Sequence, residues 1–128
     1  MFELTFMVNV FAPFYLTYKA FSEMQHPPKR VIITSSISHY LYTSHIQKID
    51  CENLNFEKGG WTPYNAYGLS KLLVIMMTRG FKYCGLLPNE TTMINMCPGT
   101  VNTKMLIAGW GPCGKDILDA DDTFCLAT

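Results

Sequence analysis

The sequence has no surplus of charge of either sign, no paired cysteine motif and no long uninterrupted apolar run. Ten lysines and arginines balance ten aspartates and glutamates, so neither nucleic acid nor an anionic membrane is expected as the main partner. The five cysteines are odd in number and include no Cys-x-x-Cys pair, so neither a disulfide framework nor a metal site is expected. The apolar stretch over residues 6–21 is interrupted by Asn9, Pro13 and Lys19, which argues against a transmembrane segment and a signal peptide. We therefore expect a reduced, cytoplasmic protein.

The composition and the apolar pattern together predict a buried α/β core. Apolar residues make up 48% of the 128 residues and charged residues 16%, which is too apolar for a disordered chain. Residues 3–24 predict one long helix, which Pro13 either kinks or begins. Residues 30–36 are β-branched and do not alternate, the pattern of a strand buried on both faces of a parallel sheet. A helix over residues 63–83 and a second buried strand over residues 91–97 complete a βαβ unit.

Two of the three remaining segments are predicted to be irregular, and the C-terminal one is predicted to be helical. Residues 37–63 form a long polar surface excursion, residues 102–114 a loop, and residues 119–127 a helix. The segment Gly109-Trp-Gly111-Pro-Cys-Gly114 satisfies Gly-x-Gly-x-x-Gly, but it follows a loop rather than a strand. It also contains Pro112, which has no N–H to offer a diphosphate. We therefore interpret it as a substrate-side loop. Trp61 and Trp110 either line a substrate pocket or anchor their loops.

The pair Tyr67 and Lys71 is the first candidate for chemistry. Four residues apart, the two side chains share one face of the second helix. A free phenol ionises near pH 10, and a neighbouring cation favours the phenolate, which makes proton exchange with an alcohol or carbonyl feasible. Taken alone, such a pair is more often an exposed helix face.

The ends of the two predicted strands supply the context for that pair. Ser35 and Ser36 close the first strand and Pro98-Gly99 follows the second, and open α/β sheets bind ligands at the carboxyl ends of their strands. A hydroxyl at that edge can hydrogen-bond a substrate oxygen. Each feature also has a plain structural interpretation: a serine that ends a strand, and a proline-glycine turn.

Taken together, these motifs resemble the short-chain dehydrogenase/reductase family, in particular its retinol-dehydrogenase-like branch. Four blocks match in order: residues 2–9 with 14–17, residues 30–36, Tyr67-Gly-Leu-Ser-Lys71, and Pro98-Gly-Thr-Val-Asn-Thr103. Tyr67 follows Ser36 by 31 residues, a long separation that suits this branch. Ala12 and Pro13 depart from the family pattern after Asn9.

The resemblance implies an NAD(P)-dependent oxidoreductase that interconverts a lipophilic alcohol and a carbonyl. Tyr67 would be the general acid/base, and Ser36 would polarise the substrate oxygen. Lys71 would favour the phenolate and bind the nicotinamide ribose, while Asn9 would hold a water in the proton relay. The cofactor side would comprise Tyr67, Lys71, Pro98, Gly99 and Thr103, with Thr103 contacting the carboxamide.

The family's glycine-rich diphosphate turn is not found in the 128 residues. We therefore expect residues 1–128 to be the C-terminal catalytic portion of one Rossmann-like domain, an incomplete doubly wound parallel sheet with flanking helices. NAD or NADP would bind only if the missing N-terminal half is supplied, and the isolated chain is expected to be loosely folded. The alternative is a truncated, inactive isoform or an incomplete gene product, which the sequence upstream of Met1 would distinguish. The resemblance also allows a homo-oligomer, and membrane association of the full-length protein.

Overall fold

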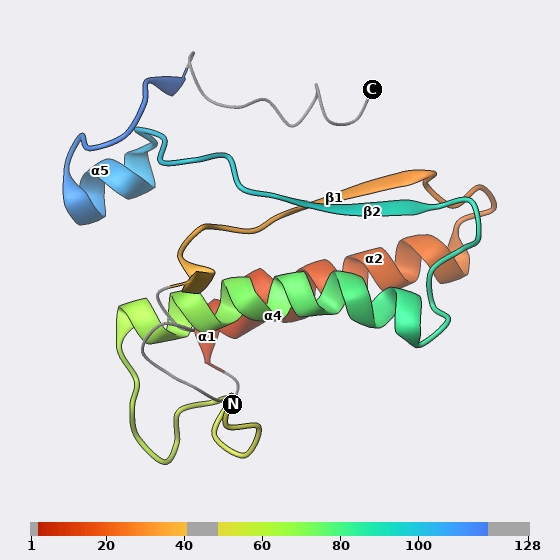
Figure 1. Cartoon of the computed structure of the whole chain (residues 1–128), viewed down its shortest axis with the longest axis horizontal. Coiled ribbons are helices and arrows are strands. Elements are labelled where there is room, and N and C mark those ends of the chain that lie inside the picture. The colour runs from red at the N-terminus through yellow and green to blue at the C-terminus, as the bar shows by residue number, and fades with distance from the viewer. Residues whose placement is uncertain (1–2, 41–48, 118–128) are drawn as a thin grey trace.

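The computed structural model describes residues 3–40 and 49–117 as a small mixed α/β structure with a two-stranded parallel sheet. The elements run in the order α1 (Leu4–Phe6), η1 (Met7–Phe11), α2 (Ala12–Glu23), β1 (Arg30–Thr34), α4 (Pro63–Tyr83), β2 (Thr92–Met96) and α5 (Lys104–Trp110). Strand β1 pairs with β2 from Arg30↔Thr92 to Thr34↔Met96. The predicted βαβ unit is confirmed, because α4 connects two parallel strands that lie side by side (Figure 1).

The helix predicted over residues 3–24 is continuous, but its second turn is wider than an α-helix. Residues Met7–Phe11 adopt π-helical geometry, and the N–H of Ala12 donates to the carbonyl of Met7, five residues back. Pro13 comes directly after this turn, at the start of α2. Because Pro13 has no N–H, it cannot form the α-helical bond to the carbonyl of Asn9. Proline and a π-turn therefore coincide around Asn9, a combination that bends helices and occurs often at functional sites.

Helix α4 begins and ends where its sequence signals lie. Thr62 caps the first turn by accepting a hydrogen bond from the Asn65 N–H at 3.0 Å, and Pro63 occupies the first helical position. The helix ends at Cys84, and Gly85 follows with a φ of 67°, a backbone conformation that favours glycine. The prediction of a helix over residues 63–83 is confirmed at both ends.

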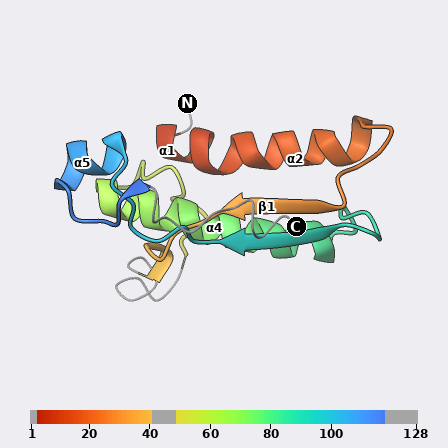
Figure 2. The same cartoon turned by 90° about the horizontal axis from the view of Figure 1, so that it is seen from above.

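Helices α2 and α4 lie on one face of the sheet (Figures 1 and 2). Ile33 of β1 packs there against Val74, Met77 and Phe81 of α4, and Phe21 of α2 joins the same cluster. The Phe81 ring lies 5.6 Å from the Phe21 ring, edge to face. Among residues 3–40 and 49–117, no helix covers the opposite face of the strands.

Three strand boundaries and one element differ from the sequence prediction. Strand β1 ends at Thr34 rather than Ser36, and β2 spans Thr92–Met96 rather than residues 91–97. Residues 102–114 were predicted as a loop, and this is wrong because they contain α5. Thr103 caps α5 by accepting from the Leu106 N–H at 3.2 Å. Residues 49–62 form turns, and the helix predicted over residues 119–127 lies outside the described residues.

Candidate active site

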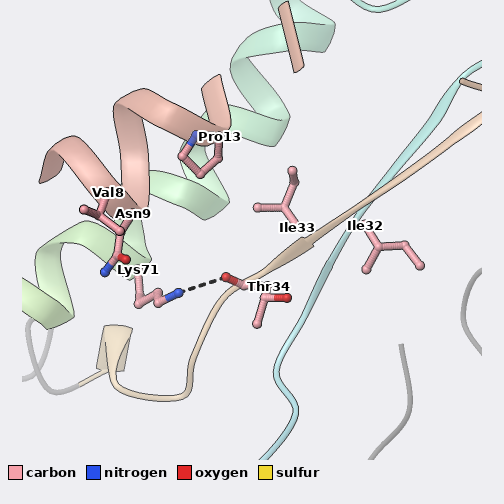
Figure 3. Close-up of a pocket in the computed structure, with 7 residues that line it drawn as sticks. All are labelled: Val8, Asn9, Pro13, Ile32, Ile33, Thr34 and Lys71. Carbon is pink, nitrogen blue, oxygen red and sulfur yellow. Dashed lines mark hydrogen bonds between the residues drawn. The ribbon is translucent and has the colours of Figure 1, made fainter. Parts of the chain in front are cut away.

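Tyr67 and Lys71 lie on α4, at its end nearest the carboxyl ends of the strands. The Lys71 Nζ is 5.7 Å from the centre of the Tyr67 ring, so the ammonium and the phenol ring are neighbours, as their spacing predicted. Both side chains are half-buried. The ammonium donates a hydrogen bond to the carbonyl of Thr34 at 3.0 Å, which fixes it to the last residue of β1 (Figure 3).

Burial is the main influence on the charge of Lys71. Removal of the ammonium from water lowers the pKa of Lys71 below its ordinary value of 10.5, while nearby Cys97 acts in the opposite direction. Cys97 directly follows β2, and its sulfur accepts a hydrogen bond from the Ile37 N–H at 3.3 Å. One group at the end of each strand, the Thr34 carbonyl and Cys97, therefore acts on the cation.

A hollow of about 310 Å³ lies between the π-turn, the end of β1 and Lys71 (Figure 3). Seven residues line it: Val8, Asn9, Pro13, Ile32, Ile33, Thr34 and Lys71. Figure 3 shows the Asn9 amide and the Lys71 side chain next to each other. The structure thus brings two of the predicted catalytic residues, Asn9 and Lys71, to one concave surface.

The Asn9 side chain is held by a residue that the sequence analysis did not single out. Its Nδ2 donates to the Ser70 Oγ at 3.0 Å, and the Ser70 hydroxyl donates to the Tyr67 carbonyl at 2.8 Å. Ser70 is fully buried. The amide nitrogen of Asn9 is therefore directed at α4, while the Asn9 Oδ1 retains its capacity to accept from a water or another donor.

Ser36 lies in a turn that follows β1. Its hydroxyl donates to the Ser38 Oγ at 3.1 Å and accepts from the Ser38 N–H at 3.1 Å, and its carbonyl accepts from the His39 N–H at 3.2 Å. In the described part of the chain no hydrogen bond joins Ser36 to Tyr67. The structure thus puts Ser36 at the predicted edge of the sheet without joining it to the pair on α4.

Ser35, the residue before it, is predicted from the sequence only as part of the serine pair that closes the strand. Its hydroxyl is buried and donates to the carbonyl of Lys71 at 3.1 Å. The pattern that could have identified this contact is the alternation of side chains along the extended residues 31–35, in which Val31, Ile33 and Ser35 share the face that meets α4.

Residues 98–103 follow β2, at the same edge of the sheet as Ser36. Gly99 has a φ of 79°, a backbone conformation that is unfavourable for residues with a Cβ atom. Thr103 uses its oxygen as an acceptor at the start of α5, which leaves its hydroxyl hydrogen able to donate. The side chain of Asn102 forms two hydrogen bonds to the backbone of Gly114, at 2.7 and 2.8 Å. These bonds close residues 102–114 into one loop that carries α5.

The Gly-x-Gly-x-x-Gly match over residues 109–114 does not have the geometry of a dinucleotide fingerprint. Gly109 lies inside α5 and Gly111 ends it, so the motif follows a helix rather than a strand. The structure also differs from the prediction that a loop precedes the motif, because Gly109 lies inside a helix. Trp110 at the end of α5 donates to the Tyr64 hydroxyl at 3.3 Å, and Trp61 donates to Glu3 at 3.5 Å. These bonds favour the anchoring interpretation of both tryptophans.

The part of the chain that the structure describes contains no group of three acidic, histidine or cysteine residues able to hold a metal ion. Within the same residues, no helix has both the length and the apolar character needed to cross a bilayer. Comparison with known proteins returns no match for the chain, either to a family model, to a curated protein or to a solved structure.

Proposed function

We propose that this chain carries the catalytic residues of an NAD(P)-dependent oxidoreductase of the short-chain dehydrogenase/reductase type. Its substrates would be a lipophilic alcohol and the corresponding carbonyl compound. The observation that carries the proposal is the Tyr67–Lys71 pair on α4, whose ammonium is hydrogen-bonded to the end of β1 and shares a hollow with Asn9. Under the proposal the two strands belong to an incomplete, doubly wound Rossmann-like sheet.

The residues at this edge fit the nicotinamide end of the cofactor. An ammonium has three N–H donors, and Thr34 takes one, so Lys71 retains two for the hydroxyls of a ribose. The hydroxyl hydrogen of Thr103 would bind the carboxamide, and Pro98 and Gly99 would lie beside the nicotinamide ring, where the positive φ of Gly99 favours a residue without a side chain. The diphosphate end requires a glycine-rich turn that is not found in the 128 residues.

When it is bound, the nicotinamide would accept or supply the hydride. The side chains of this protein would transfer the proton to or from the substrate oxygen. Tyr67 would exchange a proton with the substrate oxygen, and the positive charge of Lys71 would stabilise the negative charge on the phenol oxygen. Ser36 would exchange its bond to Ser38 for one to the substrate oxygen. Asn9 would accept from a water that links the hollow to solvent.

An activity screen on the full-length gene product tests this function. Medium-chain and long-chain primary and secondary alcohols are supplied with NAD and with NADP, and the matching aldehydes and ketones with the reduced forms, while nicotinamide absorbance is recorded. Oxidation or reduction that saturates with the lipophilic substrate supports the proposal. Saturable cofactor binding without turnover of any compound would contradict it and favour a non-catalytic product.

A further inference from the structure

The Ser35 hydroxyl donates to a carbonyl that already has a partner. Ser35 is 4% exposed, and its Oγ lies 3.1 Å from the carbonyl of Lys71, in the middle of α4. In an α-helix that carbonyl accepts from the N–H four residues later, at Ile75. The bond from Ser35 is therefore a second bond to the same oxygen, and it is not needed to satisfy the helix. Its effect is to fix the position of α4 against β1.

Thr34, the last residue of β1, and Ser35, which directly follows the strand, bind the two ends of Lys71. The Ser35 hydroxyl binds the Lys71 carbonyl, while the Thr34 carbonyl accepts from the Lys71 Nζ at 3.0 Å. The Ser35 N–H in turn donates to the carbonyl of Met96 at 2.7 Å, so this point is also fixed to β2. Lysine has a long, flexible side chain, and fixing its ammonium at one point costs side-chain rotamer entropy. Because Ser35 fixes the distance between the Lys71 backbone and the Thr34 carbonyl, fewer rotamers of the Lys71 side chain place the ammonium at that carbonyl.

We propose that Ser35 is a positioning residue for Lys71. Its hydroxyl sets the position of α4 along β1, and this keeps the Lys71 ammonium at the Thr34 carbonyl and beside the Tyr67 ring. The catalytic consequence, an oriented cation beside the general acid/base, rests on the proposed function. The placement of the ammonium does not, because it is a property of the folded chain alone.

The reactivity of individual lysines measures this placement without any turnover. The protein is acylated at its lysines with a trace of acetic anhydride over a range of pH, and peptides are quantified by mass spectrometry. The exposed residues Lys29, Lys82 and Lys104 serve as internal references in the same sample. In Ser35→Ala the labelling midpoint of Lys71 is expected to rise towards those of the references, because the ammonium is released into water.

A matched control separates positioning from a general loss of stability. Thr91 is 9% exposed, and its hydroxyl donates to the Pro28 carbonyl at 2.9 Å, at the opposite end of the two strands. Thr91→Val removes that bond and keeps the shape of the side chain, so it is expected to leave the midpoint of Lys71 unchanged. Ser35→Thr, which retains the hydroxyl, is expected to restore the wild-type midpoint.

The outcomes decide the inference in either direction. A Lys71 midpoint that is the same in Ser35→Ala and wild type, or that moves equally in Thr91→Val, overturns it. Circular dichroism checks that each variant is folded. If Ser35→Ala does not fold, Ser35→Cys replaces it, because it keeps the side-chain volume with a weaker hydrogen-bond donor, and the same outcomes apply.

In an active preparation Ser35→Ala is expected to lower kcat about tenfold and to leave KM within about twofold. Absence of turnover in wild type would count against the proposed function and leave the labelling result intact.

Discussion

Asn9 and Ser70, 61 residues apart in the sequence, are joined by a hydrogen bond of 3.0 Å from the Asn9 amide to the Ser70 hydroxyl. The Ser70 hydroxyl in turn donates a hydrogen bond of 2.8 Å to the carbonyl oxygen of Tyr67. The π-turn around Asn9 is thereby fixed to the turn of α4 that carries Tyr67 and Lys71. The candidate site thus depends on the contact between two helices as well as on the edge of the sheet.

The stability of the fold should depend on pH through Lys71. Burial lowers the pKa of Lys71 in the folded protein, whereas the unfolded chain has the ordinary value of 10.5. Between these two values the unfolded chain binds more protons, so Lys71 makes the free energy of unfolding rise with pH across that interval. We expect wild type to gain stability relative to Lys71→Met as the pH approaches 10.5, and the difference to level off above it.

Urea denaturation at a series of pH values measures this difference. Lys82→Met, which changes an exposed lysine on the same helix, is the control and should follow wild type. A difference between wild type and Lys71→Met that stays constant or shrinks as the pH rises would show that burial of the ammonium is not the dominant influence.

Phe81 is expected to be the most sensitive core position of α4. Its side chain is 1% exposed and lies between α2 and β1, with the Phe14 ring at 5.2 Å. Phe81→Ala should reduce the free energy of unfolding by about 3–5 kcal/mol, because it removes a buried ring and leaves a cavity. Tyr83→Ala, at a side chain that is 78% exposed, should change it by less than about 0.5 kcal/mol. Equal denaturation midpoints for the two variants would contradict this description of the core.

Much of this arrangement follows from local sequence signals. The helix over Pro63–Tyr83 could be predicted because its start and end are marked by Thr62, Pro63 and Gly85. The first strand could be predicted from its β-branched run, and the second from the proline-glycine stop that follows it. Helix α5 was missed because it has seven residues and ends in Gly109, Trp110 and Gly111. Its cap at Thr103 was the one usable signal.

The contacts that organise the site were not predictable in the same way. The hydrogen bonds of Ser35 to Lys71 and of Asn9 to Ser70 span 36 and 61 residues. Such bonds depend on how α2 and α4 pack on the sheet, which local periodicity does not specify. The sequence motifs therefore indicated the residue types of the site, and the packing selected the partners.

Gly114 is expected to control the closure of the loop that carries α5. A Cβ atom at this position would lie 2.6 Å from the carbonyl oxygen of Thr100, which is backbone and cannot rotate away. Gly114→Ala should therefore break the bonds to Asn102 and cost about 1–3 kcal/mol in local stability. Gly109→Ala lies in open space within α5, and it should stabilise that helix by about 0.5–1 kcal/mol.

Amide hydrogen exchange at residues 102–115 distinguishes these two variants. Faster exchange in Gly114→Ala and equal or slower exchange in Gly109→Ala are the expected results. Unchanged protection of the Lys115 amide, which donates to the Thr100 carbonyl at 2.8 Å, would show that the loop tolerates the added methyl group.

The proposed chemistry is tested most directly by removing one oxygen atom from Tyr67. Tyr67→Phe keeps the ring beside Lys71 and deletes the hydroxyl that would exchange the proton. Tyr83→Phe, the same change at an exposed position on α4, is the matched control. In the full-length gene product, steady-state turnover of the best alcohol should fall by at least about 100-fold in Tyr67→Phe, with cofactor affinity nearly unchanged, and should remain at the wild-type level in Tyr83→Phe. Turnover of Tyr67→Phe within about tenfold of wild type, a barrier change of only about 1.4 kcal/mol, would contradict the assignment of Tyr67 as the general acid/base.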